Sequence, residues 1–259
     1  MQAKSYAKVN VFLKITGTKE FNNTRYHTLN SRFILVENLY DTIGFVPAKC
    51  DSFTVEGIDG VDTKDNIIYK AYKALNSHIG DLDILEYFYN HKVVVKKNIP
   101  MGAGLGGGSA NAATFINMVK SACSLQATTE ELAKIGATLG ADVPFFIYGY
   151  KSANVSGFGE VIEEFKEDPL TLEIETPPIA CHTGRVYGSY DNRYLEKCDP
   201  NSGVTLMLQK SSDILKHFTQ PEELNDLYLP ALDIYPDLKG YAREGNYFSG
   251  SGSSFFRVV

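Results

Sequence analysis

The sequence lacks long apolar runs and strongly basic stretches, and both absences exclude classes of partner. No apolar window approaches the length of a membrane-spanning helix, and the N-terminal segment MQAKSYAKVNVFLKITG carries charges through its apolar run, unlike a signal peptide. The 25 lysines and arginines are outnumbered by 31 aspartates and glutamates, which gives a net charge of −6. We therefore expect a cytoplasmic protein that binds neither a membrane nor nucleic acid.

Cysteine is scarce, with four residues at positions 50, 123, 181 and 198 and no CxxC pair. Such scattered thiols support neither a disulfide framework nor a zinc ribbon. Cys181 and His182 are neighbours that could form half of a metal site, but no second pair accompanies them. We expect buried thiols and no metal-ligand cluster.

The composition favours a folded protein of two lobes. Hydrophobic residues make up 44% and charged residues 22% of the 259 positions, which is ordinary for a globular protein and too apolar for a disordered one. That length falls between one large domain and two modest ones. Around the run EEFKEDPLTLEIETPP the composition shifts to acid and proline. We place a domain boundary just before it, which divides the chain into residues 1–155 and 156–259.

Strand and helix patterns are mixed along the first of these lobes. Residues 5–16 alternate between an apolar face and a face that carries Lys8 and Asn10, which predicts a strand. Thr128 and Glu131 form a capping box that opens a helix. Further strands are expected at 32–47 and 91–100, with helices at 65–80, 109–125 and 131–140 and another element starting near Asp142. Because these elements do not alternate strictly, we assign the α+β class.

The segment IPMGAGLGGGSANAA, residues 99–113, places five glycines between positions 102 and 108. Glycines let backbone N–H groups approach an anion closely, and a helix starting at about Ser109 would point its free donors and positive dipole end at that anion. A turn without a ligand needs one or two special dihedral angles, not five glycines. We expect a phosphorylated ligand in this loop.

Two common phosphate-binding motifs do not fit the loop. It satisfies GxGxxG, but the acids about 20 residues further on, Glu130 and Glu131, lie in a helix-capping segment and not at the end of a second strand. A P-loop needs a lysine after its last glycine, whereas Gly108 is followed by Ser109. A dinucleotide-dependent oxidoreductase is therefore disfavoured.

Phosphoryl transfer at such a loop needs a base and a positive charge, and Asp142 and Lys8 are the candidates in otherwise apolar settings. Each residue also has a plain structural interpretation. Asp142 precedes Val143 and Pro144, so it could merely cap a helix. Lys8 could merely face solvent from its strand. The local sequence leaves both alternatives open.

Four segments, AKVNVFLKITG, PMGAGLGGGSANAA, LGADVPFF and SGSGSSFF, occur in the order of the GHMP small-molecule kinase motifs, and the sequence resembles that family. The resemblance implies a ribosomal-protein-like N-terminal domain, a ferredoxin-like C-terminal domain and a site in the cleft between them. It also implies ATP with Mg²⁺, and Ser109 is the one hydroxyl we place beside the metal. The implied nucleotide-binding residues are Pro100, Met101, Gly102, Ala103, Gly104, Leu105, Gly106, Gly107, Gly108 and Ser109, with Asn66 and Lys97 near the adenine.

The same resemblance assigns the chemistry to this chain. Lys8 and Asp142 match the catalytic lysine and aspartate of the family, with Asn10 beside the acceptor. The stretch RYHTLNSRF, followed by DTI, resembles members that phosphorylate the 2-hydroxyl of a CDP-linked methylerythritol in the non-mevalonate isoprenoid pathway. It implies that the cytosine is surrounded by Tyr26, His27, Phe33 and Tyr187.

Several alternatives stay open beside this interpretation. Within the family, the acceptor could instead be homoserine or mevalonate. A nucleotide-binding module that has lost catalysis is a rival from another class, and the presence of both Lys8 and Asp142 argues against it. We expect the protein to be a monomer or a weak homodimer.

Overall fold

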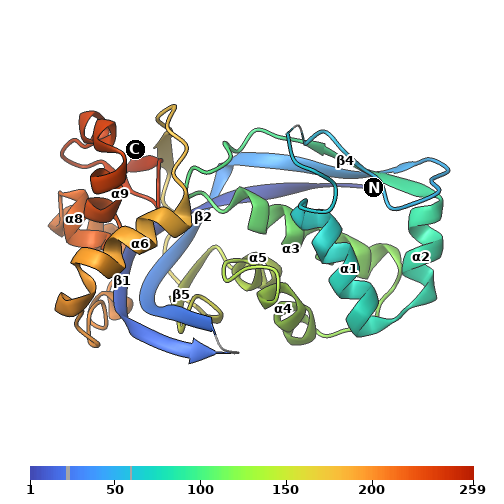
Figure 1. Ribbon diagram of the computed structural model, residues 1–259, viewed down its shortest axis with the longest axis horizontal. Helices are drawn as coiled ribbons and strands as arrows, with labels where there is room; N and C mark the ends of the chain where they lie inside the picture. Colours follow the sequence, from blue (N-terminus) through green and yellow to red (C-terminus); the bar gives the residue numbers. More distant parts are fainter. Residues whose placement is uncertain (22–23, 59) are drawn as a thin grey trace. The chain divides into compact units, whose positions relative to one another are not determined.

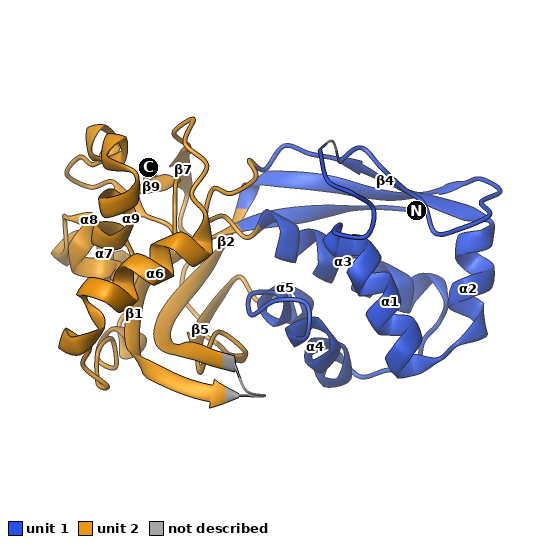
Figure 2. Cartoon of the chain, viewed as in Figure 1, with its two compact units in different colours: residues 1–7, 37–99, 107–149 blue, residues 8–36, 100–106, 150–259 orange. Residues whose placement is uncertain are grey.

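The computed structural model describes residues 1–21, 24–58 and 60–259, which form two compact units (Figure 2). Unit 1 contains residues 1–7, 37–99 and 107–149. Unit 2 contains residues 8–36, 100–106 and 150–259. The two long N-terminal strands, β1 (Gln2–Phe21) and β2 (Thr24–Pro47), pair with each other and contribute residues to both units.

Unit 1 combines the start of β1 and the second part of β2 with two further strands and five helices (Figure 1). β2 pairs antiparallel with β4 (His91–Lys96), so that Thr42 lies opposite Lys96, and β4 pairs parallel with the short β3 (Val55–Glu56). The helices are α1 (Ile67–Ile79), α2 (Leu82–Tyr89), α3 (Gly107–Ala122), α4 (Thr129–Ala137) and α5 (Val143–Tyr148).

The helix starts in unit 1 follow from side-chain caps. Asn66 and Asp81 cap α1 and α2 by accepting hydrogen bonds from backbone N–H groups two residues on. The predicted capping box of Thr128 and Glu131 is confirmed at the start of α4. The end of that helix was predicted at Gly140, which is wrong by three residues, because the chain leaves α4 after Ala137 and turns into α5.

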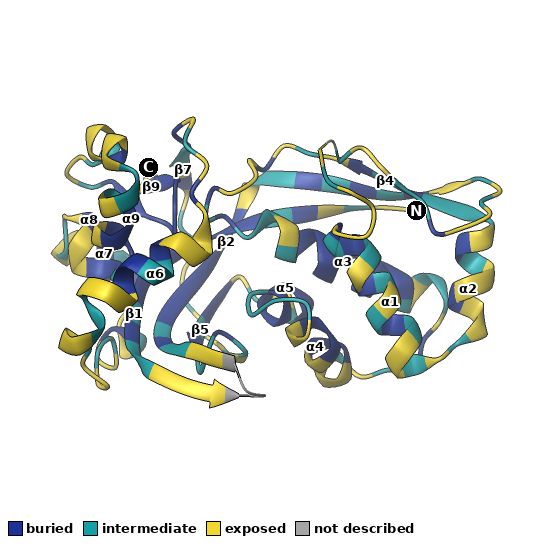
Figure 3. Cartoon of the chain, in the orientation of Figure 1, coloured by how far each residue is buried: buried dark blue, intermediate teal, exposed yellow. Residues whose placement is uncertain are grey.

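The core of unit 1 is rich in aromatic rings. Phe45, Phe53, Phe88 and Phe115 contact one another at centroid distances between 5.0 and 5.7 Å, mostly edge to face. Helix α3 is buried along most of its length after the first turn, as its dark blue colour in Figure 3 shows. Its early turns consist of small residues. Small side chains let α3 approach its neighbours closely from Ala110 onward, whereas Gly108 at the start of the helix is exposed.

Unit 2 contains part of the six-stranded sheet that also includes β3 and β4, and a separate three-stranded sheet. The first part of β2 pairs antiparallel with β5 (Ser152–Ser156), with Phe33 opposite Ala153, and β5 pairs with β6 (Val161–Glu164). The second sheet has the order β7 (Leu172–Glu175), β9 (Phe255–Val258) and β8 (Tyr247–Phe248). Strand β9 begins directly after the small-residue loop 249–254.

The remainder of unit 2 is built from short helices that the sequence patterns did not predict. They are α6 (Thr183–Arg193), α7 (Ser211–His217), α8 (Pro221–Leu224) and α9 (Tyr228–Ile234), with 3-10 turns at Leu195–Lys197, Leu206–Leu208 and Pro236–Tyr241. Their shared core includes Val186, Tyr228, Phe248 and Phe255. Burial raises the pKa of the Tyr228 phenol to about 12.

Strands and helices are mixed in both units, which confirms the α+β class. The division of the chain into domains 1–155 and 156–259 stays a prediction. Across the described residues, no helix combines the length and the apolar character that crossing a membrane requires. Of the expected buried thiols, Cys181 is confirmed, whereas Cys50, Cys123 and Cys198 are only partly covered, so the expectation was wrong for those three.

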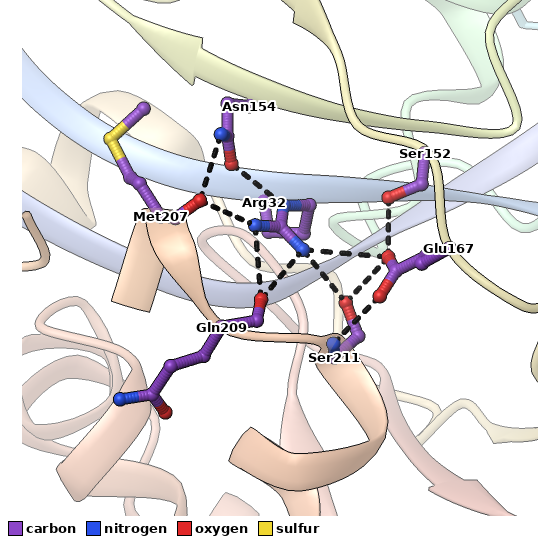
Figure 4. A network of polar contacts seen from close by, with 7 residues as sticks. All are labelled: Arg32, Ser152, Asn154, Glu167, Met207, Gln209 and Ser211. Atoms are coloured by element: carbon purple, nitrogen blue, oxygen red, sulfur yellow. Dashed lines mark hydrogen bonds and ion pairs between the residues drawn. The ribbon is translucent and has the colours of Figure 1, made fainter. Parts of the chain in front are cut away.

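A buried arginine in unit 2 lies at the centre of a network of polar contacts (Figure 4). Arg32 on β2 has no exposed surface, and its guanidinium stacks on the Phe165 ring at 3.4 Å from the centroid. Its Nε donates to Asn154 Oδ1 at 2.7 Å, and its terminal nitrogens donate to the Met207 and Gln209 carbonyl oxygens. Glu167, whose side chain is 4% exposed, lies 3.5 Å from Nη1. Burial lowers the pKa of Arg32, and Glu167 opposes that shift.

Candidate active site

The first part of the glycine loop, residues 100–106, is held by backbone and side-chain bonds within unit 2. The Lys8 N–H donates to the Leu105 carbonyl at 3.0 Å, and the Cys181 N–H donates to the Gly102 carbonyl at 3.2 Å. From the small-residue loop 249–254, the Ser254 N–H donates to the Ala103 carbonyl at 3.1 Å. The motif segments AKVNVFLKITG and SGSGSSFF therefore both contact this loop, which is itself part of a third motif segment.

Backbone conformation explains why the loop needs glycine at alternate positions. Gly102, Gly104 and Gly106 have φ values of 67°, 72° and 67°, a region that other residues adopt at a cost. A Cβ on Gly104 would lie 2.1 Å from the Ser249 carbonyl oxygen, which is backbone and cannot swing away. A Cβ on Gly102 would meet no atom closer than 3.8 Å. Gly104 therefore allows loops 100–106 and 249–254 to pack against each other.

We predict that Gly104→Ala destabilises the protein more than Gly102→Ala. Both changes force a side chain into a positive φ, at a cost of about 1–2 kcal/mol, but Gly104→Ala also creates a backbone clash that adds about 1–3 kcal/mol. Urea titrations of the two variants measure the difference directly. Equal losses in the free energy of unfolding would contradict the packing role given to Gly104.

Lys8 is buried beside the loop, which contradicts the alternative that it faces solvent. Its residue is 3% exposed, and its ammonium lies 2.6 Å from Asn10 Oδ1 and 3.3 Å from the Gly104 carbonyl oxygen. The Phe33 ring covers it at 4.6 Å from the centroid. The predicted residues Lys8, Asn10 and Phe33 are thus brought together, with the cation held against the glycine loop.

A relay of amide and hydroxyl groups orients the lysine. Asn10 Nδ2 donates to Ser31 Oγ at 3.0 Å, and the Ser31 hydroxyl donates to the Phe12 carbonyl at 2.5 Å. Because the Asn10 amide is fixed by its donor end, its oxygen is turned toward Lys8. Ser31 was not predicted, although it lies inside the quoted stretch RYHTLNSRF.

Besides Phe33, which covers Lys8, the residues predicted around a cytosine fall into two groups in unit 2. Tyr26 is 40% exposed and packs on Phe158 with ring centroids 5.1 Å apart. His27 packs on Tyr187 at 4.8 Å, with the rings tilted by 38°. His27 Nε2 also lies 2.6 Å from Asp191 Oδ1, a partner that the sequence analysis missed.

The second part of the glycine segment, in unit 1, is the N-terminus of α3. The helix begins at Gly107, two residues before the predicted start at Ser109. The Ser109 hydroxyl lies 3.8 Å from the position of a Cβ on Gly140, so it faces the turn that leads into Asp142. Free N–H groups at this helix start, together with the Ser109 hydroxyl, form a donor set suited to an anion.

Lys97 and Asn66 have structural partners in unit 1. Asn66 Oδ1 accepts from the Ile68 N–H at 2.9 Å and so caps α1. Lys97 forms a close ion pair with the fully buried Asp41 and donates to Asn111 Oδ1 at 3.1 Å. Its ammonium also lies 3.6 Å from where a Cβ on Gly107 would be, which places a positive charge at the start of α3. Proximity of either residue to adenine stays a prediction.

Asp41 is a further residue that the sequence analysis missed. Its Oδ1 accepts from the N–H groups of Asn98 and Ile99 at 2.7 and 2.8 Å, and its Oδ2 accepts from Asn111 Nδ2 at 2.9 Å. A single carboxylate therefore fixes the segment that enters the glycine loop to the helix that leaves it. An aspartate inside an otherwise apolar strand is the signal that could have identified it.

Asp142 lies at the start of α5 in unit 1, but its side chain does not cap that helix. Its backbone is already helical, with φ −79° and ψ −15°, whereas a capping residue takes an extended conformation, as Asn66 and Asp81 do. The capping alternative for Asp142 is therefore wrong.

Comparison with known proteins agrees with the arrangement of these motifs. The family model described as GHMP kinases N terminal domain matches residues 66–150. A 4-diphosphocytidyl-2-C-methyl-D-erythritol kinase from Sulfurovum sp. (strain NBC37-1) is 49% identical over 254 residues, covering 98% of this chain and 97% of the relative. The chain belongs to the GHMP kinases.

Further relatives support the assignment of this GHMP kinase. A kinase of the same name from Sulfurimonas denitrificans is 45% identical over 98% of this chain and 96% of its own. The crystal structure of a 4-(cytidine 5'-diphospho)-2C-methyl-D-erythritol kinase matches with a TM-score of 0.76 at 28% identity, covering 100% of this chain and 90% of that one. The protein is an ATP-dependent small-molecule kinase, which excludes the oxidoreductase and the module without catalysis.

Proposed function

We propose that this GHMP kinase transfers the γ-phosphoryl group of ATP to the 2-hydroxyl of 4-diphosphocytidyl-2-C-methyl-D-erythritol, in the non-mevalonate isoprenoid precursor pathway. The observation that carries the proposal is the near-full-length similarity to kinases named for that compound. The cluster of Tyr187, His27 and Asp191 in unit 2 supports it, because a ring face with a directional nitrogen suits a pyrimidine base.

The glycine segment is proposed to hold the ATP phosphates. Backbone N–H groups at Gly107 and Gly108 and the Ser109 hydroxyl are the donors at the start of α3, and Lys97 adds a positive charge near Gly107. A Cβ on Gly108 would meet no atom within 4 Å, so the space over this part of the helix start is open to a ligand. The remaining predicted loop residues, from Pro100 to Gly106, are proposed to line the nucleotide through their backbone.

Asp142 is proposed as the base that accepts the proton of the acceptor hydroxyl as its oxygen attacks the γ-phosphorus. Lys8 is proposed to stabilise the negative charge that develops on the transferred group. Its burial and its bonds to Asn10 and Gly104 hold the ammonium in one place, so little reorganisation is needed during the reaction. Asn10, Tyr26, Phe33 and Tyr187 are proposed to contact the acceptor substrate.

Mg²⁺ is proposed to arrive with ATP and to neutralise phosphate charge. The oxygen atoms of unit 1 fit this ion, because the Ser109 hydroxyl faces the turn that leads into the Asp142 carboxylate, and Mg²⁺ prefers hard oxygen ligands.

The ribosomal-protein-like and ferredoxin-like domain types are likewise proposals for residues 1–155 and 156–259.

An ATP-consumption assay with three acceptors tests the proposed function. We expect turnover with 4-diphosphocytidyl-2-C-methyl-D-erythritol and none above background with mevalonate or homoserine. Neither of these two compounds carries a nucleobase that could bind to the aromatic cluster. Phosphorus NMR of the product should show a new phosphomonoester with the diphosphate intact. Equal turnover of mevalonate or homoserine would replace the proposal with one of the two alternatives.

A further inference from the structure

Helix α6 presents two residues to the same histidine ring. Tyr187 and Asp191 are four positions apart and so lie on one face of the helix, and both contact His27 on β2. The Tyr187 ring lies against the imidazole at 4.8 Å, and Asp191 Oδ1 lies 2.6 Å from Nε2. Tyr190 adds an edge contact at 6.0 Å. The ring contacts therefore restrain the tilt of the imidazole, and the carboxylate fixes the position of Nε2.

The carboxylate decides which nitrogen of His27 carries the proton. An ionised aspartate only accepts hydrogen bonds, so Nε2 must donate to Asp191. In the neutral imidazole the other nitrogen, Nδ1, then has a lone pair and accepts a hydrogen bond. The side chains of His27 and Asp191 are 14% and 35% exposed, so the pair is partly shielded from water that would compete for these bonds.

We propose that Asp191 is a positioning residue that makes His27 Nδ1 an acceptor and so selects cytosine over uracil. The inference rests on the proposed function, which places a cytosine at this cluster. Cytosine carries an exocyclic amino group that donates a hydrogen bond, whereas uracil carries a carbonyl oxygen at the same position and would face the Nδ1 lone pair. Without Asp191, the imidazole can place its proton on either nitrogen and can serve both bases.

Binding of CDP and UDP, measured by calorimetry, tests this selection apart from catalysis. We expect wild type to bind CDP at least tenfold more tightly than UDP, and Asp191→Ala to lose most of that ratio by weakening CDP, since one directional hydrogen bond is worth about tenfold. Asp191→Asn retains an amide oxygen that accepts from Nε2, so it should keep most of the preference. Glu173→Ala, which removes an exposed partner of Arg257 elsewhere in unit 2, serves as the matched control.

Two further measurements separate positioning from a general effect on structure. Nitrogen NMR of histidine-labelled protein should show a protonated Nε2 and an unprotonated Nδ1 for His27 in wild type, and a mixture in Asp191→Ala. With the proposed substrate, Asp191→Ala should raise KM about tenfold with kcat changed less than threefold and KM for ATP unchanged.

The outcomes distinguish this inference from the proposed function. An unchanged CDP to UDP ratio in Asp191→Ala, or a wild-type preference for UDP, overturns the role of Asp191. If wild type prefers CDP and loses that preference in Asp191→Ala, the role of Asp191 stands even where the assay shows that the methylerythritol compound is not the acceptor.

Discussion

Asp142→Asn is expected to lower the turnover number by about two to four powers of ten, which is the usual range for loss of a general base. Asparagine keeps the shape of the side chain but cannot take the proton of the acceptor hydroxyl. Binding of ATP and of the acceptor should remain close to wild type. Steady-state kinetics with the proposed substrate, combined with calorimetry of each ligand, measures both effects.

Asp81→Asn is the matched control for this change. Asp81 caps α2 by accepting from the Asp83 N–H at 2.9 Å, and asparagine caps about as well, so neither stability nor turnover should change. The Asp142 side chain makes no such cap, so loss of a helix cap would not explain a lower turnover in Asp142→Asn. Near-normal turnover in a folded Asp142→Asn protein would remove this residue from the mechanism.

Arg32→Met should be strongly destabilising, at about 3–5 kcal/mol. Methionine keeps the apolar stem but leaves Glu167, with its side chain 4% exposed, without its cation. It also removes the donors to the Met207 and Gln209 carbonyl oxygens. Urea titration followed by circular dichroism measures the loss in the free energy of unfolding.

Two variants make this prediction specific. Arg257→Met breaks an exposed pair with Glu173, in which both side chains are about half exposed, and should cost no more than about 1 kcal/mol. Adding Glu167→Gln to Arg32→Met should recover part of the stability, because no buried charge is then left unpaired. If Arg32→Met lowers the free energy of unfolding no more than Arg257→Met does, the network in Figure 4 stabilises the fold no more than an exposed ion pair.

Sequence patterns predicted unit 1 well because its elements are regular. Helices α1 and α3 have 13 and 16 residues, long enough for apolar spacing to be visible, and the capping box of α4 is a local signal. Helices α7, α8 and α9 have between four and seven residues, which is too short for a periodic pattern. Their positions depend on packing against strands distant in sequence.

In the candidate site, too, features set by neighbouring residues were predicted, and features that depend on residues far apart in sequence were not. Lys8 and Asn10 were predicted from a resemblance, and the strand alternation correctly placed them on one face. Their burial could not be predicted, because it depends on the glycine loop and on Ser249, which lies 239 residues from Asn10. Asp191 was missed for the same reason, since it lies 164 residues from His27. Arg32 was missed because an arginine in a strand ordinarily indicates an exposed position.

The anchoring of the glycine segment by Asp41 bears on the entropy of nucleotide binding. A flexible glycine-rich loop loses about 1–2 kcal/mol of backbone entropy for each residue that a ligand orders. Here the entering segment is fixed at Asn98 and Ile99, the departing helix is fixed at Asn111, and residues between them are bonded within the fold. The backbone entropy of this segment is therefore lost when the protein folds and not when a ligand binds. A triphosphate bound at this segment, as proposed, would then bind without the cost of ordering it, as in any preorganised receptor.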